Sequence, residues 1–459
     1  MATVASSVAE LCAGAKRASR ALARADSDVK NAALEAIATA LEDRLEEILA
    51  ANERDMALGR EDDLGDALLD RLRLDAGRVT AIAAAVRQIA ALADPVGEVI
   101  DGRRLPNGLD VRKVRVPLGV VAVVYEARPN VTIDAAALCL KSGNAIVLRG
   151  SSSAEHSNAA LARIAAEAAV GAGLPDGCVT LVAGGGREEL AELATQSETV
   201  DLVIPRGGEG LKEALQAVAT VPVIYAASGN CHVYVDASAD AERAEAIVLN
   251  AKLQRPGVCN AVETLLVHEA IAPSFVPRIV RSLTDAGVVV RGDERVLELA
   301  RDERERGTRQ LDEREQGSAV AADATAPGLS LASQASLSDS ALVQEASEED
   351  WASEYLALTL ALGVVDSTEQ AIEHVGRYGS GHSEAIVTRD TASARAFQLG
   401  VDAACVYVNA STRFTDGGEF GMGAEIGNST QKLHARGPIG LRELCTFKYL
   451  VEGDGHVRA

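Results

Sequence analysis

The sequence lacks the features that mark membrane proteins and nucleic-acid-binding proteins. It contains no apolar run near the roughly 18 residues that a helix needs to cross a membrane, and residues 1–16 lack the charged and apolar regions of a secretory signal. Basic residues are in the minority, with 45 Lys and Arg against 67 Asp and Glu. Because binding to nucleic acid or anionic membranes requires a basic surface, the net charge of −22 argues against both. We therefore expect a soluble, cytoplasmic protein with a small-molecule substrate.

Cysteine and histidine are scattered rather than clustered. The seven cysteines are odd in number, widely spaced and without a CxxC pair, which argues against a disulfide framework and against a zinc cluster. The seven histidines form no HExxH pair, so we expect no bound metal. Most of the thiols are expected to fill the core. The remaining question is whether one of them is a nucleophile.

Hydrophobic periodicity divides the chain into two kinds of region. Residues 29–50 and 78–92 carry Ala, Leu and Ile at three- and four-residue spacing, which predicts helices. Further along, short apolar runs alternate with helical stretches. The predicted strands cover residues 120–125, 145–148, 178–182, 201–204, 223–226, 232–235, 263–267, 359–365 and 445–451. This alternation predicts an α/β protein with parallel sheets covered by helices.

Glycines follow two of these predicted strands, each time just before a helix. One set is Gly184-Gly185-Gly186, and the other is Arg206-Gly207-Gly208. Ligands gather at the carboxyl ends of parallel strands, and the N-terminus of a helix suits a phosphate group. Neither set forms GxGxxG, and each set alone is more typical of a tight turn. Two such sets in neighbouring strand–helix units nevertheless favour a nucleotide site.

Two further segments differ from the rest in composition. In residues 108–117, apolar and polar residues alternate, which predicts an exposed two-stranded arm. Residues 301–345 are first dense in charge (RDERERGTRQLDEREQ) and then rich in Ala, Ser and Thr, without a hydrophobic period. We interpret them as a flexible surface insertion, with a partner-binding or regulatory segment as the alternative.

Cys259 is the candidate nucleophile. It lies in LQRPGVCNAVET (253–264), where Pro256 and Gly257 predict a turn between a helix and the following strand. A thiol on such a loop can be exposed, and backbone amides together with Arg255 would favour its thiolate form. On these local features alone, a small buried hydrophobic residue is the alternative interpretation.

Six long stretches carry a family resemblance over nearly the whole chain except residues 301–345. They are VPLGVVAVVYEARPNVTIDAAALCLKSGNAIVLRG (116–150), DLVIPRGG (201–208), RPGVCNAVETLLVH (255–268), EEDWASEYLAL (348–358), AIEHVGRYGSGHSEAIVT (371–388) and VYVNASTRFTDGGEFGMGAEIGNSTQKLHARGPIGLRELCTFKYLV (406–451). These stretches resemble the aldehyde dehydrogenase superfamily, and within it the branch that reduces L-glutamyl 5-phosphate.

The resemblance implies roles for residues of the reaction centre. Cys259 matches the catalytic cysteine, and Asn130 matches the side chain that cradles the oxyanion together with the Cys259 backbone N–H. A turn cap is the alternative for Asn130. Thr412, Arg413 and Thr415 match the substrate-side loop, and Arg413 is the candidate cation for the acyl phosphate.

The resemblance also implies a cofactor site. Arg149 and Gly150 end a strand at the position that binds the adenosine ribose and its phosphate, so a cation there favours NADPH over NADH. The segment Arg206-Gly207-Gly208 matches the pyrophosphate loop. Glu354 matches the carboxylate that orients the nicotinamide ribose, with a solvated acid as the alternative.

One absence agrees with this branch. Hydrolytic aldehyde dehydrogenases carry a water-activating Glu in a Glu-Leu-Gly-Gly motif, whereas the corresponding Ala226-Ala227-Ser228-Gly229-Asn230 has no carboxylate. The resemblance therefore implies that Cys259 forms a thioester with L-glutamyl 5-phosphate, and that NADPH reduces it to glutamate 5-semialdehyde, the second step from glutamate to proline. The alternatives are a hydrolytic NAD(P)-dependent aldehyde dehydrogenase and a non-catalytic scaffold.

The same resemblance implies the domain layout of an aldehyde dehydrogenase-like fold. It consists of a parallel-sheet NADPH-binding domain (1–100 and 118–232), an α/β catalytic domain (233–405), a loop region on the substrate and cofactor side (406–436) and a β oligomerisation arm (101–117 and 437–459). The expected partners are copies of the same chain. A transient contact with glutamate 5-kinase is an open alternative, because the acyl phosphate cyclises readily.

Overall fold

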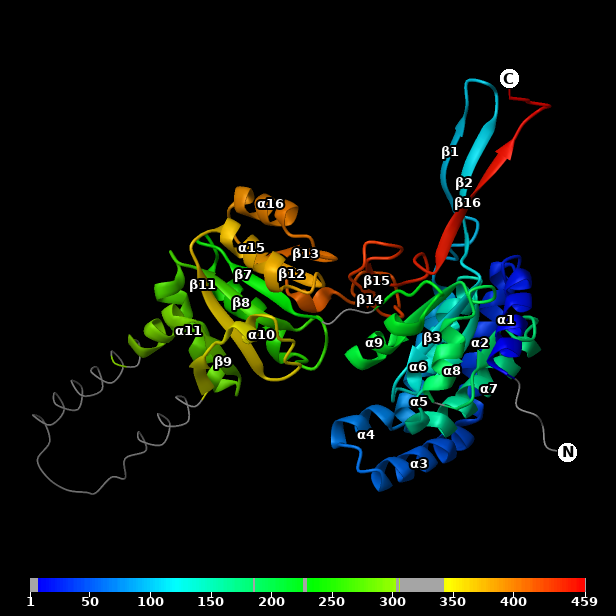
Figure 1. Ribbon diagram of the computed structural model, residues 1–459, viewed down its shortest axis with the longest axis horizontal. Helices are drawn as coiled ribbons and strands as arrows, with labels where there is room; N and C mark the ends of the chain where they lie inside the picture. Colours follow the sequence, from blue (N-terminus) through cyan, green and yellow to red (C-terminus); the bar gives the residue numbers. More distant parts are fainter. Residues whose placement is uncertain (1–6, 185, 226–228, 303–304, 306–341, 459) are drawn as a thin grey trace, which may run out of the picture. The chain divides into compact units, whose positions relative to one another are not determined.

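The chain folds into two compact units. The computed structural model describes residues 7–184, 186–225, 229–302, 305 and 342–458. Unit 1 comprises residues 1–226 and 416–459, and unit 2 comprises residues 227–415 (Figure 1). Within the described residues, no helix is long and apolar enough to cross a membrane.

A four-stranded parallel sheet in the order β5–β4–β3–β6 forms the centre of unit 1. Its strands are β3 (Val120–Tyr125), β4 (Ala145–Arg149), β5 (Val179–Leu181) and β6 (Leu202–Arg206). All six residues of β3 are buried, as expected for a central strand with helices on both faces. The helices of unit 1 are α1 (Val8–Leu22), α2 (Ser27–Asp43), α3 (Leu45–Glu61), α4 (Asp66–Leu72), α5 (Ala76–Ala91), α6 (Asn130–Lys141), η1 (Ser152–Ala154), α7 (Glu155–Gly171), α8 (Arg187–Ala194) and α9 (Glu209–Val218).

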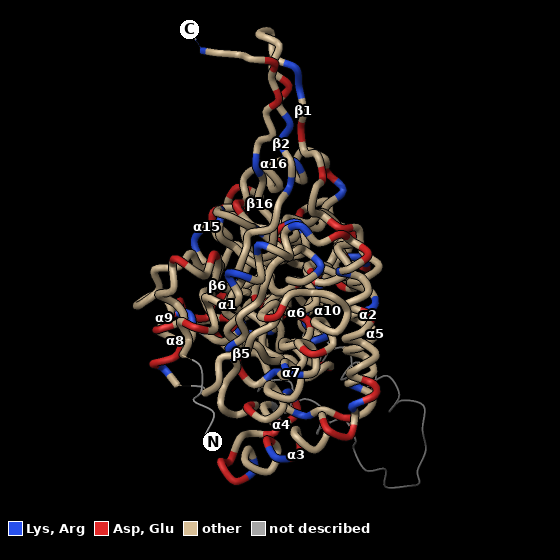
Figure 2. Tube along the Cα trace, turned by 90° about the vertical axis from the view of Figure 1, so that its right-hand side faces the viewer, with Lys and Arg blue, Asp and Glu red and all other residues tan. Residues whose placement is uncertain are grey.

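An antiparallel arm also belongs to unit 1. It consists of β1 (Val99–Arg104), β2 (Asp110–Pro117) and β16 (Cys445–Glu452), in the order β1–β2–β16 (Figure 1). Charged residues of both signs occur along it (Figure 2). The predicted arm is present, but it has three strands rather than two, and the alternating stretch supplies the single strand β2. A short ribbon of β14 (Asn428–Ser429) and β15 (Gly437–Pro438) completes the unit.

Unit 2 is built on a seven-stranded parallel sheet in the order β10–β9–β11–β8–β7–β12–β13. Its strands are β7 (Cys231–Val235), β8 (Val262–His268), β9 (Val289–Gly292), β10 (Val343–Glu345), β11 (Thr359–Val365), β12 (Ser383–Val387) and β13 (Cys405–Val408). Its helices are α10 (Ala241–Leu253), α11 (Ala272–Asp285), α14 (Glu348–Trp351), α15 (Thr368–Tyr378), α16 (Thr391–Gly400) and η2 (Thr412–Phe414).

Alternation along β7 shows how helices cover both faces of this sheet. Val233 and Val235 belong to the core cluster that includes residues of α10 and α11. Tyr234 belongs to the cluster that includes residues of α15 and α16. Because successive side chains of a strand point to opposite faces, the two clusters lie on opposite sides of the sheet.

The predicted α/β class with parallel sheets is confirmed, but several boundaries differ. The helix predicted over residues 29–50 is two helices, since α2 ends at Asp43 and α3 begins at Leu45, with no Gly or Pro to announce the break. Residues 343–345 of the predicted insertion form β10, a strand too short to show a period. Most of that insertion, residues 303–304 and 306–341, lies outside the described residues. In the predicted strand at 223–226, Val223 makes one isolated bridge to Val203.

Candidate active site

Cys259 lies on the loop that joins α10 to β8 in unit 2. None of the seven cysteines, all of which lie in the described residues, forms a disulfide; Cys259 is partly exposed, and the other six are buried. Burial raises the pKa of several of those six, for example that of Cys12 to about 11. Because a thiolate is the nucleophilic form of cysteine, burial keeps such thiols unreactive. Exposure therefore singles out the cysteine that the sequence indicated.

Gly229 packs against the backbone of Cys259. A Cβ at Gly229 would lie 1.5 Å from the carbonyl oxygen of Cys259, so only glycine permits this approach. The N–H of Gly229 donates to Oε1 of Glu354 at 2.6 Å. On the adjoining strand β7, the thiol of Cys231 donates to the same Cys259 carbonyl at 3.2 Å. The Cys259 backbone is thus held by the segment of residues 229–231, which Glu354 supports in turn.

The predicted substrate-side loop also meets the cysteine loop. The hydroxyl of Thr412 donates to the carbonyl oxygen of Asn260 at 2.7 Å, and Nδ2 of Asn260 donates to the carbonyl oxygen of Thr415 at 2.9 Å. Nε of Arg413 donates to Oε1 of Gln254 at 3.0 Å. Thr412 and Thr415 are only 0% and 2% exposed, whereas Arg413 is partly exposed. The two threonines therefore fix the loop, and Arg413 is the member of the three that can reach a ligand.

Asn130 begins α6 in unit 1. The N-cap position is held by Pro129, and the Asn130 side chain donates from Nδ2 to Oδ2 of Asp134 at 2.9 Å. Burial raises the pKa of Asp134 to about 6, while the Asn130 bond and the charge of Arg206 act in the opposite direction. Since Asn130 and Cys259 belong to different units, the oxyanion role of Asn130 stays a prediction.

Arg149 is the last residue of β4 and Arg206 is the last residue of β6, so both lie at the carboxyl end of the parallel sheet of unit 1. In the strand register, Val124 pairs with Arg149 on one side of β3, and Tyr125 pairs with Arg206 on the other. Nη2 of Arg149 donates to the carbonyl oxygen of Gly186 at 2.5 Å. Two cations at the carboxyl end of a parallel sheet suit an anionic ligand.

The glycines beside these two arginines differ in the space around them. A Cβ at Gly150 would lie 2.1 Å from Nδ2 of Asn158, and one at Gly207 would lie within 3 Å of Glu126 and Leu211. A Cβ at Gly208, by contrast, would meet nothing within 4 Å. Gly208 caps α9, and its N–H donates to Oε2 of Glu126 at 3.1 Å. A carboxylate thus takes the place of an anion at this helix N-terminus, and a bound phosphate would displace it.

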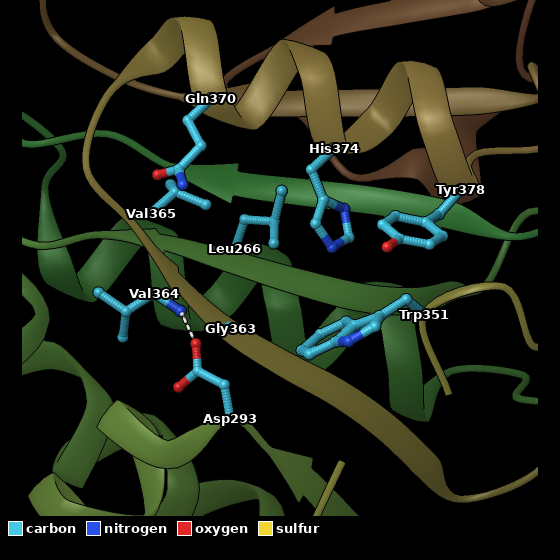
Figure 3. Close-up of a pocket in the computed structure, with 9 residues that line it drawn as sticks. All are labelled: Leu266, Asp293, Trp351, Gly363, Val364, Val365, Gln370, His374 and Tyr378. Atoms are coloured by element: carbon cyan, nitrogen blue, oxygen red, sulfur yellow. Dashed lines mark hydrogen bonds between the residues drawn. The ribbon is translucent and has the colours of Figure 1, made fainter. Parts of the chain in front are cut away.

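Unit 2 contains a pocket whose lining includes no residue of the cysteine loop (Figure 3). The lining residues are Leu266, Asp293, Trp351, Gly363, Val364, Val365, Gln370, His374 and Tyr378. Burial, together with the charges of His232 and Arg377, lowers the pKa of His374 to about 3, so its ring is neutral near pH 7. No Lys or Arg lines the pocket. It therefore offers no cation to an acyl phosphate, and the candidate site is the cysteine loop.

Several residues of the site were not predicted from the sequence. They are Gly229 and Cys231, which contact the Cys259 backbone, and Lys252 and Glu263, a buried ion pair at the two ends of the loop. The sequence offered a weak signal for the ion pair, because two charged residues lie in otherwise apolar stretches. In the segment 226–230, which lacks the carboxylate of the hydrolytic enzymes, residues 226–228 lie outside the described residues.

The protein thus has a partly exposed cysteine on a loop of one α/β unit. In the other unit, the carboxyl ends of the parallel strands carry residues that suit a nucleotide. The chain belongs to the aldehyde dehydrogenase family, whose model matches residues 2–448. It is 52% identical over 444 residues to a gamma-glutamyl phosphate reductase of Moorella thermoacetica, and 51% identical to that of Thermobifida fusca, with 97% of each chain covered in both cases.

Solved structures agree with this assignment of fold. The gamma-glutamyl phosphate reductase of Thermotoga maritima is 43% identical and superposes with a TM-score of 0.89, covering 99% of this chain and 100% of that one. An acetylating aldehyde dehydrogenase of Geobacillus thermoglucosidasius is 19% identical and has a TM-score of 0.65, with 98% of this chain and 97% of that one covered. The predicted aldehyde dehydrogenase-like fold is confirmed.

Proposed function

We propose that this chain reduces L-glutamyl 5-phosphate to L-glutamate 5-semialdehyde and phosphate, the second step from glutamate to proline. The observation that carries the proposal is the partly exposed Cys259, set on a loop that residues 229–231 and 412–415 hold, in a chain about half identical to named gamma-glutamyl phosphate reductases. A nicotinamide cofactor is expected from the family.

In this reaction the thiolate of Cys259 attacks the γ-carbonyl carbon, the C–O bond to phosphate breaks and a thioester forms on Sγ. Arg413, partly exposed beside the loop, is the candidate cation for the departing phosphate. The amide of Asn130 and the Cys259 backbone N–H would hold the oxyanion, as the family resemblance implies. When bound, the nicotinamide supplies the hydride that reduces the thioester carbon.

Phosphate rather than water is the proposed acyl partner. The family segment that carries a water-activating Glu corresponds to residues 226–230, which contain no carboxylate, and without a general base water attack on a thioester is slow. The carboxylate of Glu354 accepts the N–H of Gly229. A hydrolytic aldehyde dehydrogenase is the second candidate.

The decisive measurement is the reverse reaction with the purified protein. NADP⁺ reduction by glutamate 5-semialdehyde is followed with and without inorganic phosphate. We expect turnover that depends strictly on phosphate. Equal rates without phosphate would assign the hydrolytic function instead. No turnover, combined with no alkylation of Cys259 by iodoacetamide, would assign a non-catalytic scaffold.

We further propose NADPH as the cofactor. Arg149, Gly150 and the segment 206–208 would hold it, with Arg149 facing the 2′-phosphate and Glu354 the nicotinamide ribose. The charge-assisted bond from Arg149 is present with NADPH and absent with NADH. We expect Arg149→Gln to weaken NADPH binding about tenfold and to leave NADH binding nearly unchanged, as measured by quenching of protein fluorescence. Equal losses for both cofactors would remove the 2′-phosphate assignment.

A homo-oligomer is proposed through the arm. Its strands expose large apolar side chains, namely Val99, Ile100, Phe447, Tyr449 and Val451. Contact with a second copy of the chain would bury this apolar surface. Sedimentation of the full chain and of a Phe447→Asp/Tyr449→Asp variant tests it, and an unchanged mass for that variant would remove the arm from the interface. Contact with glutamate 5-kinase is proposed only on the chemistry of the unstable acyl phosphate.

A further inference from the structure

A buried ion pair joins the two ends of the cysteine loop. Lys252 lies in the last turn of α10, before the loop begins, and Glu263 lies in β8, after the loop ends. Their Nζ and Oε2 atoms are 2.5 Å apart, and both side chains are 0% exposed. Nζ of Lys252 also donates to the carbonyl oxygen of Val262 at 3.0 Å. The pair therefore fixes the distance between the helix and the strand that carry Cys259 between them.

The second oxygen of Glu263 reaches a different segment. Its Oε1 accepts the N–H of Leu356 at 3.3 Å. Leu356 has a φ of +52°, a left-handed conformation that is unfavourable for a leucine and needs support from its surroundings. The carbonyl oxygen of Leu356 in turn faces Gly257 of the cysteine loop and lies 3.7 Å from the position of a Cβ there. Glu263 thus holds the Leu356 turn against the loop.

The Leu356 turn directly follows Glu354. Glu354 accepts the N–H of Gly229, and Gly229 packs on the backbone of Cys259. A chain of contacts therefore runs from the ion pair through Leu356 and Glu354 to Gly229 and back to Cys259. Every residue in this chain belongs to unit 2.

Fold stability alone does not explain such a pair. Removing two charges from water costs free energy that their attraction only partly offsets, and well-packed apolar pairs of similar volume are often as stable or more so. Burial raises the pKa of Glu263 to about 7 even with Lys252 beside it, which reflects the size of that cost. A merely structural contact could be met by apolar side chains, but apolar side chains could not hold the Leu356 N–H.

We propose that Lys252 and Glu263 are positioning residues that set the geometry of the Cys259 nucleophile through the two ends of its loop and through the Leu356 turn. The proposal rests on the proposed role of Cys259. Neither residue touches the substrate. Their loss should lower kcat because the sulfur is displaced from its attack position, while substrate binding through other residues is retained.

Two double variants separate positioning from stability. Lys252→Met/Glu263→Leu removes both charges and both contacts, and Lys252→Met/Glu263→Gln removes the charges but keeps an oxygen that can accept from Leu356. The matched control is Lys30→Met/Asp94→Leu, which replaces another buried ion pair, in unit 1, that contacts no predicted site residue. Each protein is assayed in the phosphate-dependent reverse reaction, and its melting temperature is recorded.

We expect Lys252→Met/Glu263→Leu to lose about 10- to 100-fold in kcat, with KM changed by less than about threefold. The Gln-containing variant should retain more of the activity, and the control should retain kcat whatever its melting temperature. The proposal is overturned if Lys252→Met/Glu263→Leu folds and keeps kcat within twofold of the parent protein. It is also overturned if KM and not kcat takes the loss.

Failure of the proposed function gives a different result. If the parent protein shows no turnover, the assignment of the reaction fails, and the loop is then tested by alkylation of Cys259 with iodoacetamide, followed by intact mass. An alkylation rate against pH that is identical in the parent and in both double variants would overturn the positioning proposal. If the Leu-containing variant does not fold, the Gln-containing variant carries the same test.

Discussion

The cysteine loop of unit 2 and the glycine turns of unit 1 are held in place by different means. Around Cys259, side chains fix the backbone, with Lys252 and Glu263 closing the loop and Asn260 joining it to the substrate-side segment. Beside Arg149 and Arg206, glycines allow close backbone packing at Gly150 and Gly207, and only Gly208 of these three leaves room for a ligand. A nucleophile must be aimed to a fraction of an ångström, whereas a phosphate needs only accessible N–H groups and a cation.

This difference also explains what the sequence could and could not reveal. Turn residues and strand patterns located the Cys259 loop and the glycine turns, because those signals are local. The Lys252–Glu263 pair, the approach of Gly229 to Cys259 and the left-handed Leu356 depend on how distant segments pack. No periodicity reports such contacts. The proposed roles of Asn130, Glu354 and Arg413 came from family resemblance, and the residues alone left alternatives open for the first two.

The largest expected effect comes from removing the thiol that the whole loop presents. Cys259→Ser should reduce the phosphate-dependent reverse reaction by at least about 10⁴-fold, since a serine hydroxyl is a far weaker nucleophile. Binding of NADPH, measured by fluorescence, should be nearly unchanged. The matched control is Cys178→Ala in unit 1, a buried cysteine, which should retain kcat. Retained turnover in Cys259→Ser would refute Cys259 as the nucleophile.

The next effect tests whether the cysteine loop tolerates displacement of its backbone. In Gly229→Ala the new methyl group overlaps the Cys259 carbonyl, so the loop must shift, and we expect kcat to fall about 100-fold. Gly257→Ala is the control within the same loop, because its methyl group would make only an ordinary contact at 3.7 Å. Similar kcat values for the two variants would show that the loop is not held tightly against Gly229.

A smaller effect is expected at the open glycine of unit 1. Gly208→Ala meets nothing within 4 Å in the protein, so its melting temperature should not fall. Its methyl group would occupy the space proposed for the pyrophosphate, and we expect the Kd for NADPH to rise about tenfold. Gly171→Ala, also in open space but at the end of α7, should leave that Kd unchanged. An unchanged Kd in Gly208→Ala would move the pyrophosphate away from this turn.

The last comparison concerns stability, and it sets the partly exposed Asp134 of unit 1 against the buried Glu263 of unit 2. Asp134 in unit 1 has an amide donor in Asn130, and burial raises its pKa from 3.8 to about 6. The folded protein therefore binds this proton more tightly than the unfolded chain, and the contribution of Asp134 to stability falls as pH rises from about 4 to about 6. Asp134→Asn should remove that fall, so that the variant gains about 1–3 kcal/mol over the parent protein between pH 4 and pH 8.

Glu263→Gln provides the opposite case in unit 2, because its carboxylate has the Lys252 ammonium as a partner. Replacing it leaves that ammonium buried without its counter-charge, which should destabilise the protein by about 3–5 kcal/mol at pH 8. Urea unfolding of both variants at pH 4 and pH 8 measures the two shifts. Opposite signs at pH 8 would mean that the partner decides whether a carboxylate stabilises its unit. If both variants change the stability in the same direction, burial alone decides whether the carboxylate stabilises the protein. The two regions would then differ in their use of glycine and not in the effect of their carboxylates.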